Sequence, residues 1–259
     1  MGRYMIHLAY NGANFNGWQR QPHSPSVQQH IEDIFSLVLR TPIEITGCGR
    51  TDTGVHADEY FAHFDFAGAF PDGLLRRLNR LLPSGIVILQ LHKVPSGTHA
   101  RFDARLRAYR YEITFVKDPF RPDTVTVFPF ADRVDTELLN ATAALIRSYS
   151  EFTPFCKTNS DAKTMNCMVR RATWDIRPDG WTFHISANRF LRGMVRLIVG
   201  CCLEVGQGKL ELQSVRHSLD EQVPLQRPLS APAEGLFLTE VEYPQQGLWE
   251  LLDEAILLR

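Results

Sequence analysis

A glycine-rich stretch at residues 47–58, GCGRTDTGVHAD, contains the residues best suited to chemistry. Its three glycines permit backbone conformations that other residues avoid, so we expect a tight turn that holds Arg50 and Asp52 in fixed positions. An aspartate, with a reference pKa of about 3.9, is ionised at neutral pH and can act as a nucleophile or as a base. Taken alone, the stretch has a second interpretation, in which Asp52 closes an Asx turn and Arg50 is a surface charge.

The elements around this stretch follow one order twice along the chain. In the first half, apolar periods predict a helix that opens at Ser24 and ends before Pro42, a helix at 72–82, and strands at 4–10, 43–48, 61–66 and 86–94. In the second half they predict helices at 136–148 and 190–204, and strands at 108–116, 168–177, 181–188 and 235–243. Helices at 211–219 and 246–258 are additions.

This repeated β-α-β-β-α-β order predicts an α+β fold with two ferredoxin-like (RRM-like) halves, residues 1–104 and residues 105–259. We expect their antiparallel sheets to join around a central RNA-binding cleft, since sheets of this type also serve RNA-recognition modules. The polar region at 150–167 is expected to be a loop, either an ordinary solvated one or a flap that contacts RNA. A fold alone does not specify function, so the residues must decide it.

Composition and cysteine usage narrow the class of protein. A chain of 259 residues, 44% of them hydrophobic, can build a packed globular fold. No apolar run approaches the ~20 residues that cross a bilayer, and the alternating N-terminus is typical of a strand rather than a signal peptide. We therefore expect a cytoplasmic protein without a membrane segment. The five cysteines include no CxxC pair, which favours reduced, mostly buried thiols over disulfides or a structural zinc site.

The distribution of charge is more informative than its total. A net charge of -1 is low for a protein that binds nucleic acid, but the acids concentrate after residue 220 while arginines cluster elsewhere. We expect these arginines to line a basic groove, although each alone could be a plain surface charge. The candidate phosphate contacts are Arg101, Arg105, Arg110, Arg189 and Arg192.

Several separated segments together resemble one family. GRTDTGVHA, at residues 49–57, resembles the signature of the tRNA pseudouridine synthase A family. The segments that match the family in its order are YNGANFNGWQRQ, SVQQHIEDIF, HARFDARLRAYRYEI, NRFLRGMVRLIVG and APAEGLFLTEVEY. The resemblance spans nearly the whole chain and the combination is highly specific. Thr53 departs from the alanine that is most common in the family, and we expect this to affect the fine geometry at Asp52 more than activity.

The resemblance implies an enzyme that isomerises uridine to pseudouridine in tRNA, at positions 38, 39 and 40 of the anticodon stem-loop. Asp52 would be the catalytic aspartate, acting at the ribose as nucleophile or base, and Arg50 would occupy the space left by the extruded base. Tyr109 would stack on the uracil, and Arg196 would pair with the Asp52 carboxylate. The reaction requires no cofactor or metal. Family members work as homodimers, with one tRNA spanning both subunits.

The spacing of apolar residues bears on the roles that the resemblance implies for Arg196 and Tyr109. The helix expected at 190–204 has an apolar face from which Arg196 is excluded, so this side chain would point toward a groove or toward solvent. Tyr109 and Tyr111 could both be ordinary residues of a strand, and for Tyr111 we favour that interpretation.

Three other functions compete with this hypothesis. A catalytically silent RNA-binding module of the same fold would have no need of Asp52, Tyr109 and Arg196 together. A metal-dependent hydrolase could be assembled from ligands of plausible type, but they lack the spacing of a zinc site. These ligands would be His56, Asp58, His63 and Asp65. A glycoside hydrolase using Asp52 with Asp58 lacks any sign that the two carboxylates flank one bond.

Overall fold

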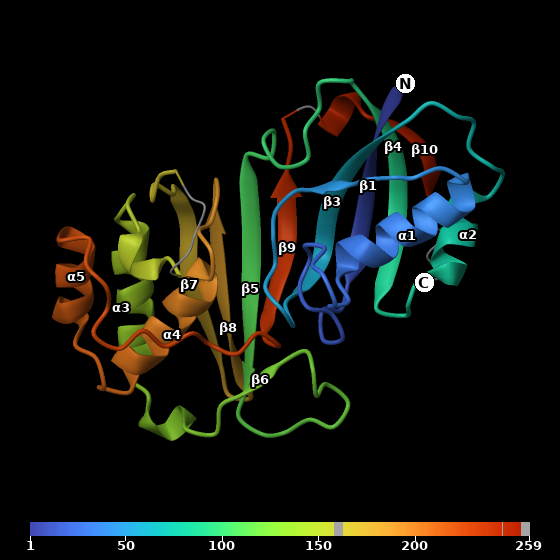
Figure 1. The fold of residues 1–259 in the computed structure, drawn as a ribbon. Coiled ribbons are helices and arrows are strands. Elements are labelled where there is room, and N and C mark those ends of the chain that lie inside the picture. The colour runs from blue at the N-terminus through green and yellow to red at the C-terminus, as the bar shows by residue number, and fades with distance from the viewer. Residues whose placement is uncertain (158–162, 245, 255–259) are drawn as a thin grey trace. The chain divides into compact units, whose positions relative to one another are not determined.

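The computed structural model describes residues 1–157, 163–244 and 246–254. Its secondary structure is α+β, with mostly antiparallel strands and several α-helices (Figure 1). The residues form two compact units, Met1–Arg105 together with Leu238–Arg259, and Leu106–Phe237. Residues 238–254 therefore belong by their contacts to the first unit, although they lie near the C-terminal end of the sequence. Within the described part of the chain, no helix is long and apolar enough to span a membrane.

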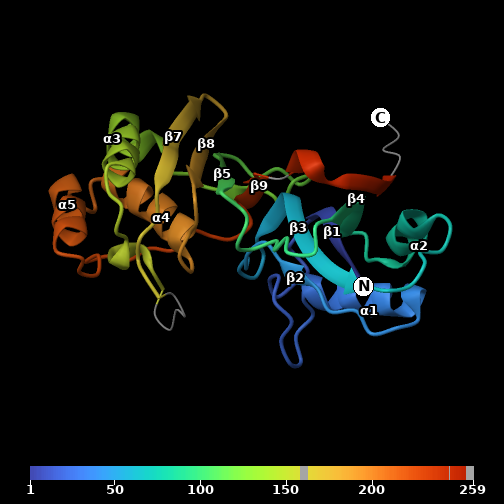
Figure 2. The same cartoon turned by 90° about the horizontal axis from the view of Figure 1, so that it is seen from above.

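The first unit contains an antiparallel sheet with the strand order β10-β4-β1-β3, and β2 pairs with β3. Its strands are β1 (Gly2–Tyr10), β2 (Thr46–Gly47), β3 (His56–Phe66), β4 (Ile86–Val94) and β10 (Glu250–Glu254). Its helices are α1 (Val27–Leu39) and α2 (Leu74–Leu81), and α1 lies along one face of the sheet (Figure 2). The expected strands at 4–10 and 86–94 and both expected helices are confirmed. β3 begins earlier than expected, at His56.

Alternation along β1 explains which face of the sheet receives α1. Ile6 and Leu8 are fully buried, as the apolar positions of a half-covered strand should be. Phe35 of α1 meets Phe64 of β3 edge to face, with ring centroids 5.2 Å apart. Ser26 caps α1 by accepting a hydrogen bond from the next turn of main chain, which sets the start of the helix.

The C-terminal helix expected at 246–258 is wrong. Gln246–Leu248 forms a 3-10 helix, η3, and Glu250–Glu254 forms β10, which pairs with β4; residues 255–258 lie outside the described ranges. Tertiary contacts override the local helical period, because β4 would otherwise expose an unpaired edge. Trp249 adds to this by packing against the rings of Phe61 and His92, each with a centroid distance of 5.7 Å.

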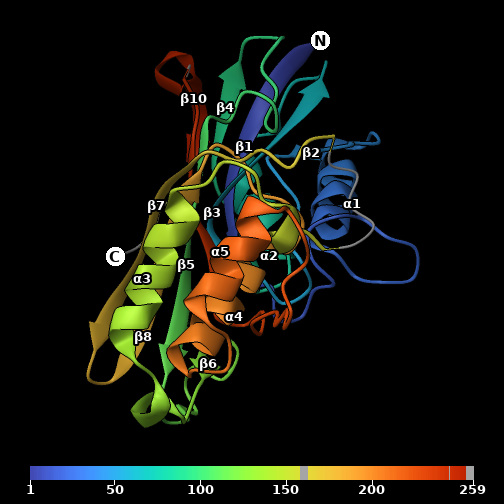
Figure 3. The same cartoon turned by 90° about the vertical axis from the view of Figure 1, so that its left-hand side faces the viewer.

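The second unit contains the antiparallel strands β5-β8-β7, with β6 paired in parallel to β5. Its strands are β5 (Leu106–Thr114), β6 (Thr126–Val127), β7 (Val169–Arg177) and β8 (Gly180–Ala187). Its α-helices are α3 (Thr136–Arg147), α4 (Met194–Gly206) and α5 (Leu212–Asp220), with α3 and α4 side by side (Figure 3). These bounds confirm the elements expected here, except that α4 begins later than expected and β6 was not predicted. β9 (Leu236–Glu242) spans the residue at which the two units divide.

Short 3-10 helices complete the second unit at Ala131–Arg133, η1, and at Thr153–Phe155, η2. The loop expected at 150–167 contains η2, and its residues 158–162 lie outside the described ranges, so its role as an RNA-contacting flap stays a prediction. The cysteine prediction is confirmed, because all five thiols are free and all but Cys156 are buried.

The helix expected at 190–204 begins later, at Met194. The Asn188 side chain accepts hydrogen bonds from the main-chain N–H groups of Met168, at 2.7 Å, and Arg189, at 2.9 Å, and so holds the preceding segment as a loop. Arg189 and Arg192 therefore lie before the helix and not on it. Arg196 is the one residue of α4 that is not buried.

Beyond pairing with β4, β10 caps a helix. The N-cap of α2 is Gly73, which offers no side chain, and the Asp253 carboxylate accepts a hydrogen bond from the Leu75 N–H at 3.1 Å instead. A negative charge there also interacts favourably with the helix dipole. We expect Asp253→Ala to lower the free energy of unfolding in urea by about 0.5–2 kcal/mol. Glu250→Ala, at an exposed position of the same strand, should change it by less than about 0.5 kcal/mol, and equal losses would contradict the capping role.

Candidate active site

The Asp52 loop, residues 48–55, connects β2 to β3. The Cys48 N–H donates to the Phe61 carbonyl at 2.8 Å, and the Tyr60 hydroxyl donates to the Gly49 carbonyl, so β3 anchors the start of the loop. The loop closes where the Val55 N–H donates to the Asp52 carbonyl at 3.2 Å. Gly54 has a φ of 78° at the third position of this turn, as a type II turn requires.

Thr51, the residue before Asp52, is fixed by two other parts of the first unit. Its carbonyl accepts a hydrogen bond from the Trp18 N–H at 3.2 Å, and its hydroxyl is 2.9 Å from the hydroxyl of Tyr10. The Trp18 indole stacks on the Tyr60 ring at a centroid distance of 4.0 Å. Asp52 itself is partly exposed, so its backbone is held while its side chain remains accessible.

Close packing of main chain against main chain also shapes the loop. Gly17 has a φ of 80°, and a methyl group added there would lie 2.5 Å from the Thr51 carbonyl oxygen. Only glycine combines this backbone conformation with so close an approach. Sequence reasoning did not identify Gly17, Trp18 or Thr51 as parts of the site, although all three lie in segments that carry the family resemblance.

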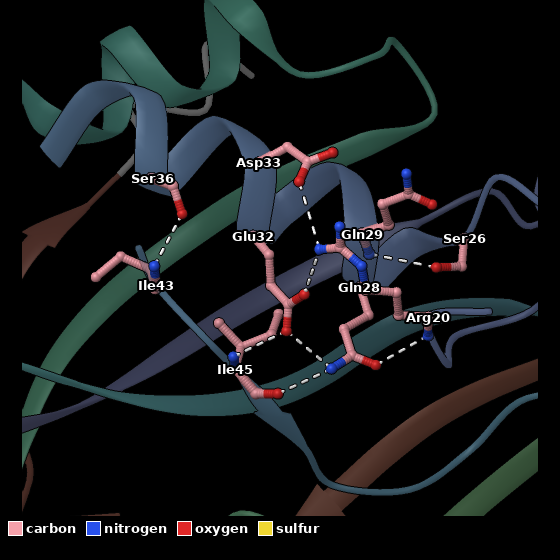
Figure 4. Close-up of polar contacts among 9 residues, drawn as sticks. All are labelled: Arg20, Ser26, Gln28, Gln29, Glu32, Asp33, Ser36, Ile43 and Ile45. Carbon is pink, nitrogen blue, oxygen red and sulfur yellow. Dashed lines mark hydrogen bonds and ion pairs between the residues drawn. The ribbon is translucent and has the colours of Figure 1, made fainter. Parts of the chain in front are cut away.

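The strand expected at 43–48 exists only as the two residues of β2. Before β2, side chains of α1 take the place of a neighbouring strand (Figure 4). The Ile43 N–H donates to the Ser36 hydroxyl at 2.8 Å, and the Ile45 N–H donates to the Glu32 carboxylate at 3.1 Å. The main chain is therefore extended and hydrogen-bonded without belonging to the sheet for most of its length.

Tyr109 and Tyr111 lie on the same face of β5 but in different surroundings. Tyr111 is fully buried, its hydroxyl donates to the Pro232 carbonyl at 2.9 Å, and burial raises the pKa of that hydroxyl well above its ordinary value. Tyr109 is partly exposed, and its ring meets Phe190 edge to face at a centroid distance of 5.2 Å. Tyr111 is thus a structural residue, whereas Tyr109 can still contact a ligand.

Arg196 lies in the first turn of α4 and is tied to one loop residue by two hydrogen bonds. Its Nε donates to the Ala231 carbonyl at 2.6 Å, and the Ala231 N–H donates to the Arg196 carbonyl at 3.0 Å. The Tyr111 hydroxyl bonds Pro232, the next residue of the same loop. Residues 231–232 therefore orient the guanidinium relative to β5, a role that sequence reasoning missed.

The other arginines occupy different kinds of position. Arg50, Arg101, Arg105 and Arg192 are exposed, and Arg189 is partly exposed. Arg110 lies on the face of β5 opposite to Tyr109, because side chains alternate along a strand. Its guanidinium lies 3.1 Å from the Glu112 carboxylate and 4.1 Å above the ring of Phe237.

The structure brings together some of the expected site residues within each unit. Arg50 and Asp52 share one loop of the first unit, and Tyr109 and Arg196 lie in the second unit. Arg110 is separated from Tyr109 by the thickness of the sheet.

Three of the four residues considered for a metal-dependent hydrolase hold structural positions, and the fourth, Asp58, is exposed. The His56 Nδ1 accepts a hydrogen bond from the Gly12 N–H at 3.0 Å, and the His63 Nδ1 accepts one from the Ala100 N–H at 3.1 Å. Burial lowers the pKa of His63 to about 4. Asp65 forms an ion pair with Arg3 at 2.8 Å. Among the residues that the structure describes, no three histidine, cysteine or acidic side chains are grouped so that they could hold a metal ion.

The chain is similar to proteins named tRNA pseudouridine synthase A from several bacteria. It is 44% identical to that of Parabacteroides distasonis over 95% of this chain and 98% of the relative, and 44% identical to that of Porphyromonas gingivalis over 94% and 98%. It is 41% identical to that of Bacteroides thetaiotaomicron over 99% of this chain and 96% of the relative. Residues 150–244 match the family model described as tRNA pseudouridine synthase.

A control variant separates the effect of the contact between Gly17 and the Asp52 loop from the effect of backbone strain. Gly208 of the second unit also has a positive φ, 67°, but a methyl group added there would meet no described atom within 4 Å. We expect Gly208→Ala to lower the free energy of unfolding by about 1–2 kcal/mol through strain alone. Gly17→Ala should lower it further and should speed backbone amide exchange across residues 48–55. Urea titration and mass-detected exchange measure both, and unchanged exchange in the loop would contradict the contact.

Proposed function

The chain belongs to the tRNA pseudouridine synthase A family and is a tRNA pseudouridine synthase, and we propose that Asp52 is its catalytic carboxylate. What supports Asp52 is the pairing of a tightly held backbone with a partly exposed side chain. A catalytic group must be positioned within a fraction of an ångström and must still meet its substrate. The reaction detaches uracil from C1′ of a uridine, rotates it and rejoins it through C5. Asp52 acts either as a nucleophile toward C1′ or as a base toward the 2′ proton.

Tyr109 and Arg196 are proposed to complete the site. The ring of Tyr109 stacks on the detached uracil and keeps it in place during rotation, and its hydroxyl can assist proton transfer. The guanidinium of Arg196, oriented by its bond to Ala231, pairs with the Asp52 carboxylate. Support comes from their partial exposure, in contrast to the burial of Tyr111 and of the rest of α4.

Arg50 is proposed to enter the space that the flipped nucleotide leaves. Extruding a base costs a few kcal/mol of lost stacking and pairing, and a cation inserted near the phosphates offsets part of that cost. Its exposure, two residues before Asp52 in a well-anchored loop, suits this role. The proposed targets are the uridines at positions 38, 39 and 40 of the tRNA anticodon arm.

The finer architecture is also a proposal, with two ferredoxin-like halves, residues 1–104 and 105–259, whose sheets meet at the RNA-binding cleft. In the first unit the strand order β4-β1-β3-β2 supports it, because two α-helices connect these strands in the β-α-β-β-α-β sequence. In the second unit the order β5-β8-β7 and the positions of α3 and α4 in the chain are consistent with the same plan. We further propose a cytoplasmic homodimer in which one tRNA spans both subunits.

The catalytic role of Asp52 is tested by tritium release from tRNA labelled at C5 of uridine. We expect the native protein to release tritium, and Asp52→Asn and Asp52→Ala to lower the rate by about a thousand-fold or more, equivalent to ~4 kcal/mol of barrier. Both variants should still bind tRNA, since the loop backbone is held by other residues. Asp58→Asn, at an exposed position in β3, is the matched control and should keep its rate within about twofold.

Two outcomes would overturn these assignments. Release by Asp52→Asn at more than a tenth of the native rate would remove Asp52 from the chemistry. Tight binding of tRNA by the native protein without any release would favour the catalytically silent RNA-binding module.

The arginine positions give a second test, of tRNA binding. An arginine that contacts a phosphate releases a counterion on binding, so its loss lowers affinity and reduces the slope of log K against log salt by about one. We expect this result for Arg101→Ala, because Arg101 is exposed. Arg110→Ala should leave the slope unchanged, because Arg110 is paired with Glu112. Equal slopes for the two variants would contradict the assignment of Arg101 as a phosphate contact.

A further inference from the structure

We propose that Gln28 is a positioning residue for the Asp52 loop, an inference that rests on the proposed catalytic role of Asp52. Two segments next to this loop have little strand pairing, which is limited to the two residues of β2. The first, which we call the entry segment, is residues 43–47, directly before the loop. The second, the Trp18 segment, is residues 17–20, which contacts the loop at Thr51. Gln28 lies in the first turn of α1 and bonds to both segments (Figure 4).

One side chain links the two segments through its donor and its acceptor. The Gln28 Oε1 accepts a hydrogen bond from the Arg20 N–H at 3.0 Å, and Nε2 donates to the Ile45 carbonyl at 3.1 Å. The Gln28 main-chain N–H donates to the Trp18 carbonyl at 3.0 Å. A primary amide carries its donor and its acceptor on two separate atoms, so the Gln28 side chain can bond to both segments at once.

Glu32, one helical turn later, completes the link. Its Oε1 accepts hydrogen bonds from Gln28 Nε2 at 2.9 Å and from the Ile45 N–H at 3.1 Å, and its Oε2 accepts from Arg20 Nη1 at 3.0 Å. The Glu32 side chain is only 8% exposed, and a buried carboxylate is stable only when it is paired and hydrogen-bonded. Gln28 and Glu32 together satisfy both main-chain groups of Ile45, as a neighbouring strand would.

This network reaches the proposed catalytic residue through Thr51. The Trp18 N–H holds the Thr51 carbonyl, and Gly17 packs against the same oxygen. A shift of the Trp18 segment relative to the entry segment would therefore move Thr51, the neighbour of Asp52. Misplacing a reactive group by about an ångström can cost about a hundred-fold in rate without changing the group itself. Gln28 fixes the separation of the two segments and thereby the position of the loop between them.

The experiment compares Gln28→Ala and Gln28→Glu with Gln29→Ala, a matched control of the same residue type in the same helical turn. Gln28→Glu keeps the acceptor for Arg20 but places an oxygen against the Ile45 carbonyl and the Glu32 carboxylate. Single-turnover tritium release and tRNA Kd are measured for each folded variant. We expect both Gln28 variants to slow release by about ten- to a hundred-fold with Kd changed less than about threefold. Gln29→Ala should change neither quantity by more than about twofold.

A double variant tests whether the hydrogen bond between positions 28 and 32 accounts for the lost rate. In Q28E/E32Q the amide and the carboxylate exchange places, so the hydrogen bond between positions 28 and 32 returns without two facing carboxylates. We expect it to recover at least half of the logarithmic loss in rate caused by Gln28→Glu. Thermal unfolding of all variants shows whether lost stability could explain lost rate.

Amide exchange across residues 48–55 tests positioning independently of activity. We expect Gln28→Ala to speed exchange in this loop while exchange in β5 and β8 stays unchanged. Normal single-turnover rates and normal loop exchange in the Gln28 variants would overturn the proposal. A native protein that releases no tritium, combined with faster loop exchange in Gln28→Ala, would instead retain the positioning role and overturn the proposed chemistry.

Discussion

The first unit depends on one constraint, that the Asp52 loop must leave the sheet while its backbone polar groups remain hydrogen-bonded. β2 contributes only two residues of strand pairing. The main-chain groups around it are satisfied by the Tyr60 hydroxyl, by the Trp18 N–H and by side chains of α1. The position of the loop therefore depends on side chains of β3 and α1 and on the main chain at Trp18, and sheet geometry alone does not set it.

The second unit uses a similar arrangement to present the other proposed site residues. The buried hydroxyl of Tyr111 and the main chain of Arg196 hold consecutive residues of one loop, Ala231 and Pro232. Because burial raises the pKa of Tyr111 well above its ordinary value, its hydroxyl keeps its proton and remains a donor. Tyr109, two positions earlier on the same face of β5, is left partly exposed. One strand thus supplies a structural tyrosine and a tyrosine proposed to contact the substrate.

The positions of the charges, more than their total, bear on how a chain with a net charge of -1 can act on a polyanion. Glu32 and Asp65 are paired with arginines at 3.0 and 2.8 Å, and each ion pair cancels one positive and one negative charge. Arg50 and Arg101 are exposed, so they can face RNA although the total charge is close to zero.

The sequence by itself determined the family, through motifs spread along nearly the whole chain. It also determined the elements whose apolar faces pack on one partner. β1, α1 and β4 are of this kind, because a local period of two or 3.6 residues directly encodes which side is buried. Arg50 and Asp52 could be placed in a glycine-shaped turn for the same local reason, but the parts that hold this turn could not.

Tertiary structure alone decided the elements whose hydrogen-bond partners lie far away in the chain. Ile45 lies outside the sheet, because the hydrogen-bond partners of its main chain are side chains of α1 at residues 28 and 32. Residues 250–254 form a strand because the edge of β4 was open to them, although their local period is helical. It also decided that the Arg110 guanidinium lies 4.1 Å above the ring of Phe237, a residue far away in the chain. A short stretch of sequence shows which side of an element is apolar. The partners that form hydrogen bonds with its polar groups come together only when the chain folds.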